Sequence, residues 1–295
     1  MPLTPPLLSP EFLARLERME LVTRKVFRGR VKGDRRSKRK GQSVEFSDFR
    51  NYVPGDDLRR LDWNLYARLD KLIIKLFLEE EDLHLYLLLD ASRSMEFGVP
   101  SKLQYAKELA AALAFIGLVR TDRVRIETLG QAASQRSPVF HGRSSVQRMI
   151  RQVEGIGLED SISMDDGVKN FCLRNRGRGL VVLISDLMDK QGYESALRWF
   201  VVHQVDCYVI HLLSQEELSP DIKGDLKLID CEDQDVAEIT VTGPLLTRYQ
   251  KALHVFTRDA QEFCIRRGIQ YMFANNQIPM EQLVSHHLRR RGLVR

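Results

Sequence analysis

The sequence predicts an α/β fold in which helices cover both faces of a doubly wound, mostly parallel sheet. From residue 83 onward, strand-like apolar runs alternate with segments of helical periodicity, the order of elements that builds such a sheet. Several runs are apolar at every position, as expected of parallel strands that are buried on both faces. Residues 1–80 stand outside this alternation, so we expect a small N-terminal module before an α/β domain at residues 81–295.

Five apolar runs are expected to form the strands of the sheet. They are LHLYLLLD (83–90), RVRIETLG (123–130), GLVVLISD (179–186), VDCYVIHLL (205–213) and GIQYMFAN (268–275). Helices are expected at residues 101–120, 144–155, 192–203, 245–267 and 280–290. An antiparallel hairpin at the edge of the sheet is expected from LKLID (226–230) and AEITV (237–241).

The N-terminal module is expected to contain a short helix, a turn and a strand. The helix is expected from Pro10 to Met19, and the strand from Leu72 to Leu78. Pro54-Gly55 suits the two central positions of a type II turn. The next residues, Asp56 and Asp57, are both suitable caps for a short helix that carries Arg59, Arg60 and Trp63.

The positive charge of the chain is concentrated in one short segment. Residues 23–41 carry ten Lys and Arg side chains and a single acid, a local charge of +9, whereas the whole chain carries +5. This basic arm (residues 24–40) is open to three interpretations: a solvated loop, a docking surface for an acidic protein, or a nucleic-acid contact. Phe27 is its only aromatic side chain, so base-stacking platforms are missing, and we favour the first two interpretations.

Composition points to a cytoplasmic protein without a membrane span. The longest apolar stretch, Leu109 to Val119, reaches roughly 16 Å as a helix, about half of what a bilayer needs. Prolines interrupt the apolar part of the amino terminus, which argues against a signal peptide. The four cysteines are far apart and form no C-x-x-C motif, which favours reduced thiols over disulfides.

Polar side chains follow two of the expected strands. LYLLLDASRSM (85–95) presents Asp90, Ser92 and Ser94, and Asp186 ends LVVLISD. Ligands of open α/β sheets bind beyond the carboxyl ends of the strands. Two carboxylates ~4 Å apart there would repel each other by on the order of 4 kcal/mol at an effective dielectric near 20, and a bound cation removes this repulsion. The oxygen-only set suits Mg²⁺, with Mn²⁺ or Ca²⁺ as alternatives.

The D-x-S-x-S motif after a buried strand resembles the metal-ion-dependent adhesion site of von Willebrand factor A domains. The resemblance implies a Rossmann-like sheet in which Ser92 and Ser94 coordinate the cation directly. It also implies that a threonine from a second loop and an aspartate from a third complete the site, directly or through water. Asp186 matches the third loop, within ISDLMD.

The second loop departs from the pattern of that family. It corresponds to GLEDSISMDDGVKNF (157–171), where Ile162 stands at the position expected for threonine once Met164 is placed on the apolar face of the following helix. Ser161 or Ser163 could replace the threonine as a metal ligand. Ser163 is equally suited to cap the helix.

The segment before the α/β domain resembles the DUF58 family. The motif EF-x-D-x-R-x-Y-x-PGDD-x-RR-x-DW of that family is matched within GRVKGDRRSKRKGQSVEFSDFRNYVPGDDLRRLDWNLYAR (29–68). The resemblance implies an adaptor-like or chaperone-like role beside AAA+ ATPases of the MoxR type. We interpret the motif as structural, with its acids paired to its arginines and its aromatic side chains packing the module on the α/β domain. The acids are Asp56, Asp57 and Asp62, the arginines Arg50, Arg59 and Arg60, and the aromatics Tyr52 and Trp63.

We therefore expect a metal-dependent binding protein rather than an enzyme. The sequence shows no nucleophile–base pair, no Gly-rich phosphate loop and no H-E-x-x-H. A partner's carboxylate would fill an open position on the cation. One alternative is a metal-dependent hydrolase with Glu96, Asp160 or Asp189 as base; another is a scaffold whose metal site is vestigial. A haloacid-dehalogenase-type phosphatase would need a second aspartate where Ser92 stands.

Overall fold

The computed structural model describes residues 7–22, 45–78, 83–130, 137–159, 162–175, 179–222, 224–229 and 236–295. The chain forms two compact units, one of residues 25–82 and one of residues 1–24 together with 83–295. The basic arm lies outside the described residues, so its three interpretations stay open.

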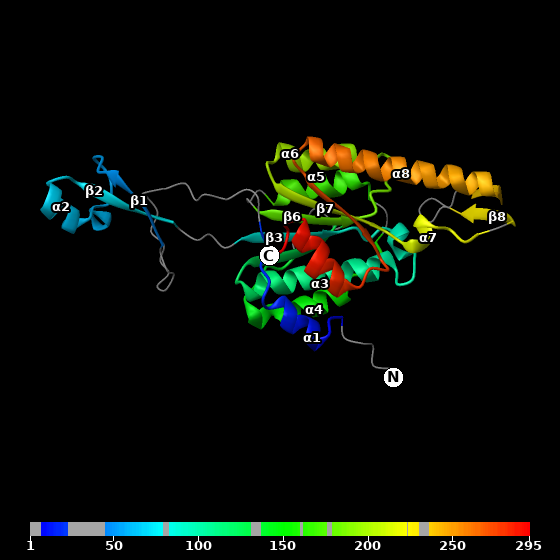
Figure 1. The fold of residues 1–295 in the computed structure, drawn as a ribbon, viewed down its shortest axis with the longest axis horizontal. Helices are drawn as coiled ribbons and strands as arrows, with labels where there is room; N and C mark the ends of the chain where they lie inside the picture. Colours follow the sequence, from blue (N-terminus) through cyan, green and yellow to red (C-terminus); the bar gives the residue numbers. More distant parts are fainter. Residues whose placement is uncertain are drawn as a thin grey trace. The chain divides into compact units, whose positions relative to one another are not determined.

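The larger unit is built on a six-stranded sheet (Figure 1). Five neighbouring strands run parallel, and the sixth pairs antiparallel with the last of them. Their order across the sheet is β10 (Gln270–Asn275), β7 (Asp206–Leu213), β6 (Leu180–Ser185), β3 (His84–Leu89), β4 (Arg123–Thr128) and β5 (Phe140–His141). The five parallel strands are the five predicted from the sequence, which confirms the α/β fold class. The two-residue β5 was not predicted because it is too short to show a pattern.

Helices cover both faces of this sheet (Figure 1). One face packs against α1 (Pro10–Leu16), α3 (Lys102–Val119), α4 (Val146–Glu154), α9 (Met280–Gln282) and the π-helical η4 (Leu283–Leu288). The other face packs against α5 (Met164–Arg174), α6 (Glu194–Val202) and α8 (Gly243–Arg266). Alternate residues of β3 divide between the faces: Leu85, Leu87 and Leu89 lie in the first apolar cluster, and Tyr86 and Leu88 in the second. This double burial explains the continuous apolar runs of the sequence.

Helix α1 belongs to the larger unit and not to the N-terminal module in which the sequence placed it. Its side chains Phe12 and Leu16 are buried in the cluster that contains α3. The unit of residues 25–82 therefore begins after α1. None of the helices in the described part of the chain combines the length and apolar character needed to cross a membrane. The apolar stretch from Leu109 to Val119 is instead the buried part of α3.

The predicted hairpin forms, but not at the edge of the main sheet. Strands β8 (Gly224–Ile229) and β9 (Val236–Val241) pair antiparallel as a separate two-stranded sheet before α8. The edges of the six-stranded sheet are β10 and β5. Helix α7 (Gln215–Leu218) connects β7 to this hairpin region.

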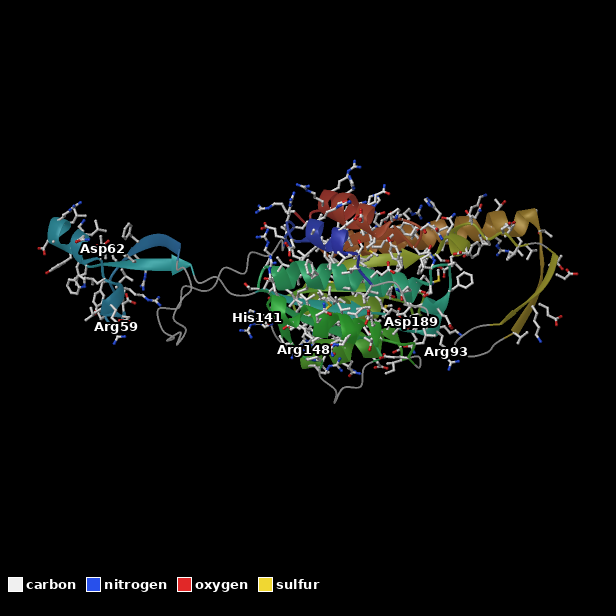
Figure 2. The ribbon with its side chains drawn as sticks, turned by 90° about the horizontal axis from the view of Figure 1, so that it is seen from below. Arg59, Asp62, Arg93, His141, Arg148 and Asp189 are labelled. Atoms are coloured by element: carbon white, nitrogen blue, oxygen red, sulfur yellow. The ribbon has the colours of Figure 1, made fainter. Side chains whose placement is uncertain are left out.

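The smaller unit consists of an antiparallel pair and two short helices. Strands β1 (Glu45–Asn51) and β2 (Ile73–Leu78) enclose η1 (Leu58–Arg60) and α2 (Trp63–Leu69). Arg50 pairs with Asp56 at 2.8 Å as expected, whereas Asp57 accepts from the backbone of Arg59 and caps η1. Asp62, labelled in Figure 2, caps α2. It pairs with Lys75 at 3.0 Å rather than with an arginine.

The packing of the aromatic side chains on the α/β domain stays a prediction, and within the smaller unit Trp63 is largely exposed. Trp63 keeps 61% of its surface exposed, and its ring meets that of Tyr66 edge to face at 6.1 Å between centroids. Trp63 and Tyr66 are three positions apart on α2 and therefore neighbours on its surface.

Candidate metal centre

Two aspartates meet at the carboxyl edge of the main sheet. Asp90 follows β3, Asp186 follows β6, and these strands are parallel neighbours. The backbone N–H of Asp90 donates to the carbonyl of Ile184 at 2.9 Å. This bond continues the hydrogen bonding between β3 and β6 up to Asp90. Both carboxylates are buried, with 5% and 1% of the residue surface exposed. The structure thus brings together the two acids that the sequence singled out.

The Asp90 carboxylate is held by two hydrogen bonds. The hydroxyl of Ser185 donates to Oδ2 at 2.6 Å, and the backbone N–H of Ser92 donates to Oδ1 at 3.0 Å. Burial, reinforced by the charge of Asp186, raises the pKa of Asp90 to about 6. Each oxygen of this carboxylate keeps acceptor capacity for a further partner.

The two serines of the motif form a hydrogen-bonded chain that ends on Asp186. The hydroxyl of Ser94 donates to Asp186 Oδ2 at 2.8 Å, and Ser92 Oγ lies 3.0 Å from Ser94 Oγ. Because Ser94 has a single hydroxyl proton, Ser92 must be the donor between the two serines. The lone pairs of Ser92 Oγ are therefore not needed within this chain and can coordinate a cation.

A buried lysine, which the sequence analysis missed, neutralises this edge of the sheet. Lys102 Nζ lies 2.7 Å from Asp186 Oδ2 and 2.5 Å from Glu217 Oε1, and Lys102 has no exposed surface. Burial disfavours both charged forms. Even so, the Lys102 ammonium holds the pKa of Asp186 below its usual range, and the two carboxylates raise the pKa of Lys102.

One feature of the sequence could have drawn attention to Lys102 as a residue with acidic partners. It is the first residue of α3, directly after the capping Ser101, where the positive end of the helix dipole disfavours a cation. A lysine at that position needs compensating acids. One of them, Glu217, is itself fixed because it forms a capping box with Ser214 at the start of α7.

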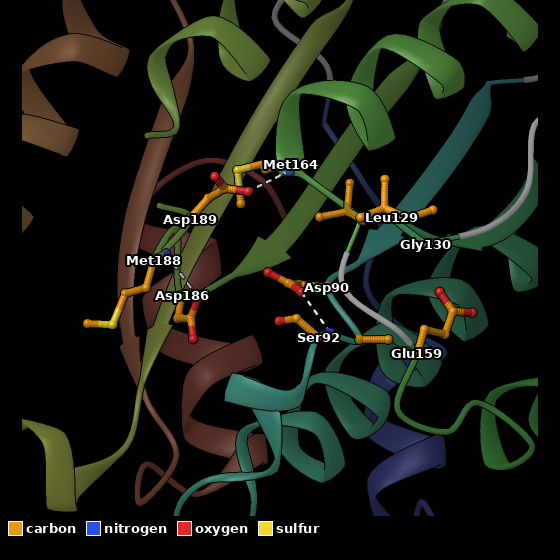
Figure 3. Close-up of a pocket in the computed structure, with 11 residues that line it drawn as sticks. Asp90, Ser92, Leu129, Gly130, Glu159, Met164, Asp186, Met188 and Asp189 are labelled. Carbon is orange, nitrogen blue, oxygen red and sulfur yellow. Dashed lines mark hydrogen bonds between the residues drawn. The ribbon is translucent and has the colours of Figure 1, made fainter. Parts of the chain in front are cut away.

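A small cavity of about 30 Å³ lies beside the cluster (Figure 3). Asp90, Ser92 and Asp186 line it, as do the carboxyl-bearing Glu159 and Asp189. This volume suits a water molecule or a small cation. Among the residues that the structure describes, no group of three or more His, Cys, Asp or Glu is arranged to hold a metal. Any cation here must therefore rely on hydroxyl oxygens and water beside its carboxylates, a set that fits Mg²⁺.

In the second loop, the serine next to the expected ligand position caps a helix. Ser163 Oγ accepts from the backbone of Asp166 at 3.2 Å and caps α5, which bears out the capping interpretation. Met164 is buried, in agreement with the alignment that placed Ile162 at the threonine position, and Ile162 lines the cavity. Ser161, the other candidate, lies outside the described residues, so its role as a ligand stays a prediction.

The two further carboxylates of the cavity fix loops. Asp189 accepts from the backbone N–H groups of Met164 at 2.6 Å and Gln191 at 2.7 Å, so both of its oxygens have donors. Glu159 Oε1 accepts from Thr128 Oγ1 at 2.6 Å. The backbone N–H of Glu159 also donates to the carbonyl of Ala91 at 2.8 Å and ties the second loop to the first.

The direction of the third loop is set by a strained residue. Leu187, directly after Asp186, is a non-glycine residue with φ of 59° and a fully buried side chain. Its N–H donates to Ser185 Oγ at 2.9 Å, the hydroxyl that also donates to Asp90. Ser185 therefore links the turn that aims Asp186 to the carboxylate of Asp90. Non-glycine residues in this region of φ cluster at functional sites.

Replacing Ser94 by alanine is expected to weaken Mn²⁺ binding by at least about tenfold, because a ligand and the link between Ser92 and Asp186 are both lost. The free energy of unfolding should fall by only about 1 kcal/mol, the usual contribution of one hydrogen bond. Isothermal titration with Mn²⁺ and urea denaturation measure the two effects. Ser195→Ala, at an exposed position of α6, is the control and should change neither. Unchanged Mn²⁺ affinity in Ser94→Ala would remove this serine from the site.

Comparison with known proteins places the chain in a family. The model of DUF58, described as a protein of unknown function, matches residues 48–257. The chain belongs to the DUF58 family. Uncharacterized proteins of Mycobacterium tuberculosis (Rv1480) and Mycobacterium bovis (Mb1516) are each 29% identical to this DUF58 protein over 251 residues, covering 83% of it and 78% of their own length.

Two solved structures share distant likeness with this DUF58 protein. BatB of Bacteroides thetaiotaomicron has a TM-score of 0.43 and 15% identity, over 71% of this chain and 98% of its own. An aerotolerance-related membrane protein of Bacteroides fragilis has a TM-score of 0.41 and 16% identity, over 70% of this chain and 99% of its own.

Proposed function

We propose that this DUF58 protein is a non-enzymatic binding protein that captures an acidic group of a protein partner through a bound Mg²⁺ ion. Asp90, Ser92 and Ser94 would hold the cation, with Asp186 behind them. The observation that carries the proposal is the convergence of these four residues from two strand ends in one hydrogen-bonded cluster beside a small cavity.

The hydrogen bonds of the cluster support different roles for the two aspartates, with only Asp90 bound directly to the cation. Asp186 accepts from Ser94, from Lys102 and from the backbone N–H of Met188, which leaves it little capacity for a metal ion. Asp90 then becomes the direct carboxylate ligand. One carboxylate leaves a divalent cation with net positive charge, which favours a further anionic ligand from outside.

The surroundings of the cluster also favour an acidic partner. Arg93 lies between the two serines in the chain and is exposed (Figure 2). Its positive charge on the same loop would attract a carboxylate toward the site. The partner group would thus meet two positive charges on one loop.

Binding is favoured over hydrolysis because the candidate bases are poorly placed to activate water. Glu96 is exposed and does not line the cavity, and Asp189 is engaged in fixing two loops through hydrogen bonds from the backbone N–H groups of Met164 and Gln191. Asp160 lies outside the described residues. A general base must lie within hydrogen-bond reach of the water that it activates.

The partner that the family resemblance suggests is an AAA+ ATPase of the MoxR type, with this protein acting in the cytoplasm as an adaptor for assembly or remodelling. Capture of that ATPase by the immobilised full-length protein should require Mg²⁺, be lost in EDTA and be lost in Asp90→Ala. The Ser195→Ala protein serves as control and should behave as wild type. Equal capture by wild type and Asp90→Ala, with and without EDTA, would rule the proposal out.

A further inference from the structure

An apolar groove lies next to the metal cluster, between the end of η2 (Arg93–Glu96), α7 and the start of α8. We call it the α7–α8 groove; its volume is about 610 Å³, within the range of sites that bind ligands or peptide side chains. Four large apolar side chains around it each expose more than a third of their surface: Phe97 (52%), Ile222 (38%), Leu245 (36%) and Tyr249 (37%). Contiguous exposed apolar patches on soluble proteins often mark binding sites.

Acidic side chains line the groove, and one of their carboxylate oxygens has no hydrogen-bond donor among the described residues. Glu216 and Asp221 line it, and no Lys or Arg is among its described lining residues. Glu216 Oε2 is buried and has no hydrogen-bond partner among the described residues. A buried carboxylate oxygen without a donor is unfavourable, and a cationic group supplied from outside would correct this. Glu217 differs, because Lys102 already neutralises it.

The walls of the groove are held in place before any ligand binds. The hydroxyl of Tyr249 donates to the backbone carbonyl of Glu217 at 2.9 Å and fixes α8 against α7. Gly98, with φ of 99°, brings the loop after η2 so close that a Cβ there would lie 2.7 Å from Ser214 Cβ. Preformed walls reduce the entropy cost of binding.

We propose that the α7–α8 groove binds a segment of a partner protein that carries an apolar anchor side chain next to a lysine or arginine. The anchor fills the apolar wall, and the cation donates to Glu216 at the rim. This goes beyond the proposed metal-dependent capture, because it recognises the opposite charge and needs no metal ion. The groove and the metal cluster share a wall: Phe97 follows the loop of Ser94, and Lys102 joins Asp186 to Glu217.

A random dodecapeptide library displayed on phage, panned on the full-length protein in EDTA and counter-selected on Leu245→Ser, tests this inference. Enriched peptides should combine a large apolar residue with a neighbouring Lys or Arg. The best of them, synthesised with a fluorophore and measured by anisotropy, should lose at least about tenfold affinity with Leu245→Ser or Ile222→Ser. Glu216→Gln should remove the preference for a basic residue. Ile265→Ser, exposed at 62% at the other end of α8, is the matched control and should bind as wild type.

Several outcomes would overturn the inference. They are enrichment of acidic peptides, no enrichment over the counter-selected protein, or equal affinity of all variants for the best peptide. Dimerisation that Leu245→Ser abolishes, seen by sedimentation without peptide, would assign the groove to a second copy of this chain instead. Because all arms contain EDTA, failure of the metal site cannot imitate failure of the groove. Thermal unfolding checks that each surface variant is folded.

Discussion

Replacing Lys102 by methionine is expected to lower the free energy of unfolding by about 3–5 kcal/mol, the usual cost of leaving a buried charge without its partner. The ammonium is fully buried and pairs with Asp186 and Glu217, which come from two other elements of the fold. Without it, both carboxylates stay in the interior and lose their shared counter-charge. Urea denaturation of wild type and Lys102→Met at neutral pH measures the difference.

Two further variants show that charge rather than packing causes the loss. Lys102→Met with Asp186→Asn and Glu217→Gln removes all three charges and should recover part of the stability, because the glutamine can still serve the cap of α7. Lys251→Met, at an exposed position of α8, should change the stability by less than about 0.5 kcal/mol. A Lys102→Met protein as stable as wild type would show that the ammonium does not neutralise this edge of the sheet.

Replacing Asp90 by asparagine is expected to stabilise the metal-free protein at pH 7 and above by up to about 2–3 kcal/mol. The pKa of Asp90 is raised, chiefly by burial, to about 6, above the ~4 of an unfolded aspartate. Between these values the folded state holds a proton that the unfolded state has released. The stability of the metal-free wild type therefore falls as the pH rises from about 4 to about 6, and the loss is complete above that range.

Thermal and urea unfolding of wild type and Asp90→Asn, in EDTA between pH 4 and pH 8, measure this effect. The variant should lack the component of the pH dependence that Asp90 contributes. Mg²⁺ should restore stability to the wild type, because it favours the ionised carboxylate, and should leave Asp90→Asn unchanged. If Asp90→Asn were less stable than wild type at pH 8 in EDTA, the ionised Asp90 carboxylate would not destabilise the metal-free fold, and the account would be contradicted.

Much of the fold could be predicted because local patterns determine it. The continuous apolar runs predicted the five parallel strands, and the polar residues at their carboxyl ends predicted that Asp90 and Asp186 meet. The placement of α1 could not be predicted, because an amphipathic helix does not specify which apolar surface it covers. The hairpin of β8 and β9 formed as predicted, but its separation from the main sheet depends on tertiary packing.

The polar contacts around the site were less predictable than the site itself. Lys102 and Glu217 are 115 positions apart in the sequence, and no periodicity relates them. Ser185 lies within an apolar run, and the pattern of that run does not indicate a role for its side chain. In the structure its hydroxyl links Asp90 to the third loop. Such contacts follow from side-chain directions at the ends of neighbouring strands, which a one-dimensional pattern does not contain.

Anomalous diffraction from crystals of the full-length protein grown with Mn²⁺ tests the central claim most directly. We expect one strong peak in the cavity beside β3 and β6, with oxygens of Asp90, Ser92 and Ser94 at roughly the 2.0–2.3 Å typical of a small divalent cation. The ammonium of Lys102 should stay on Asp186. Well-diffracting crystals with no peak there at millimolar Mn²⁺, or with the ion bound elsewhere, would contradict the account.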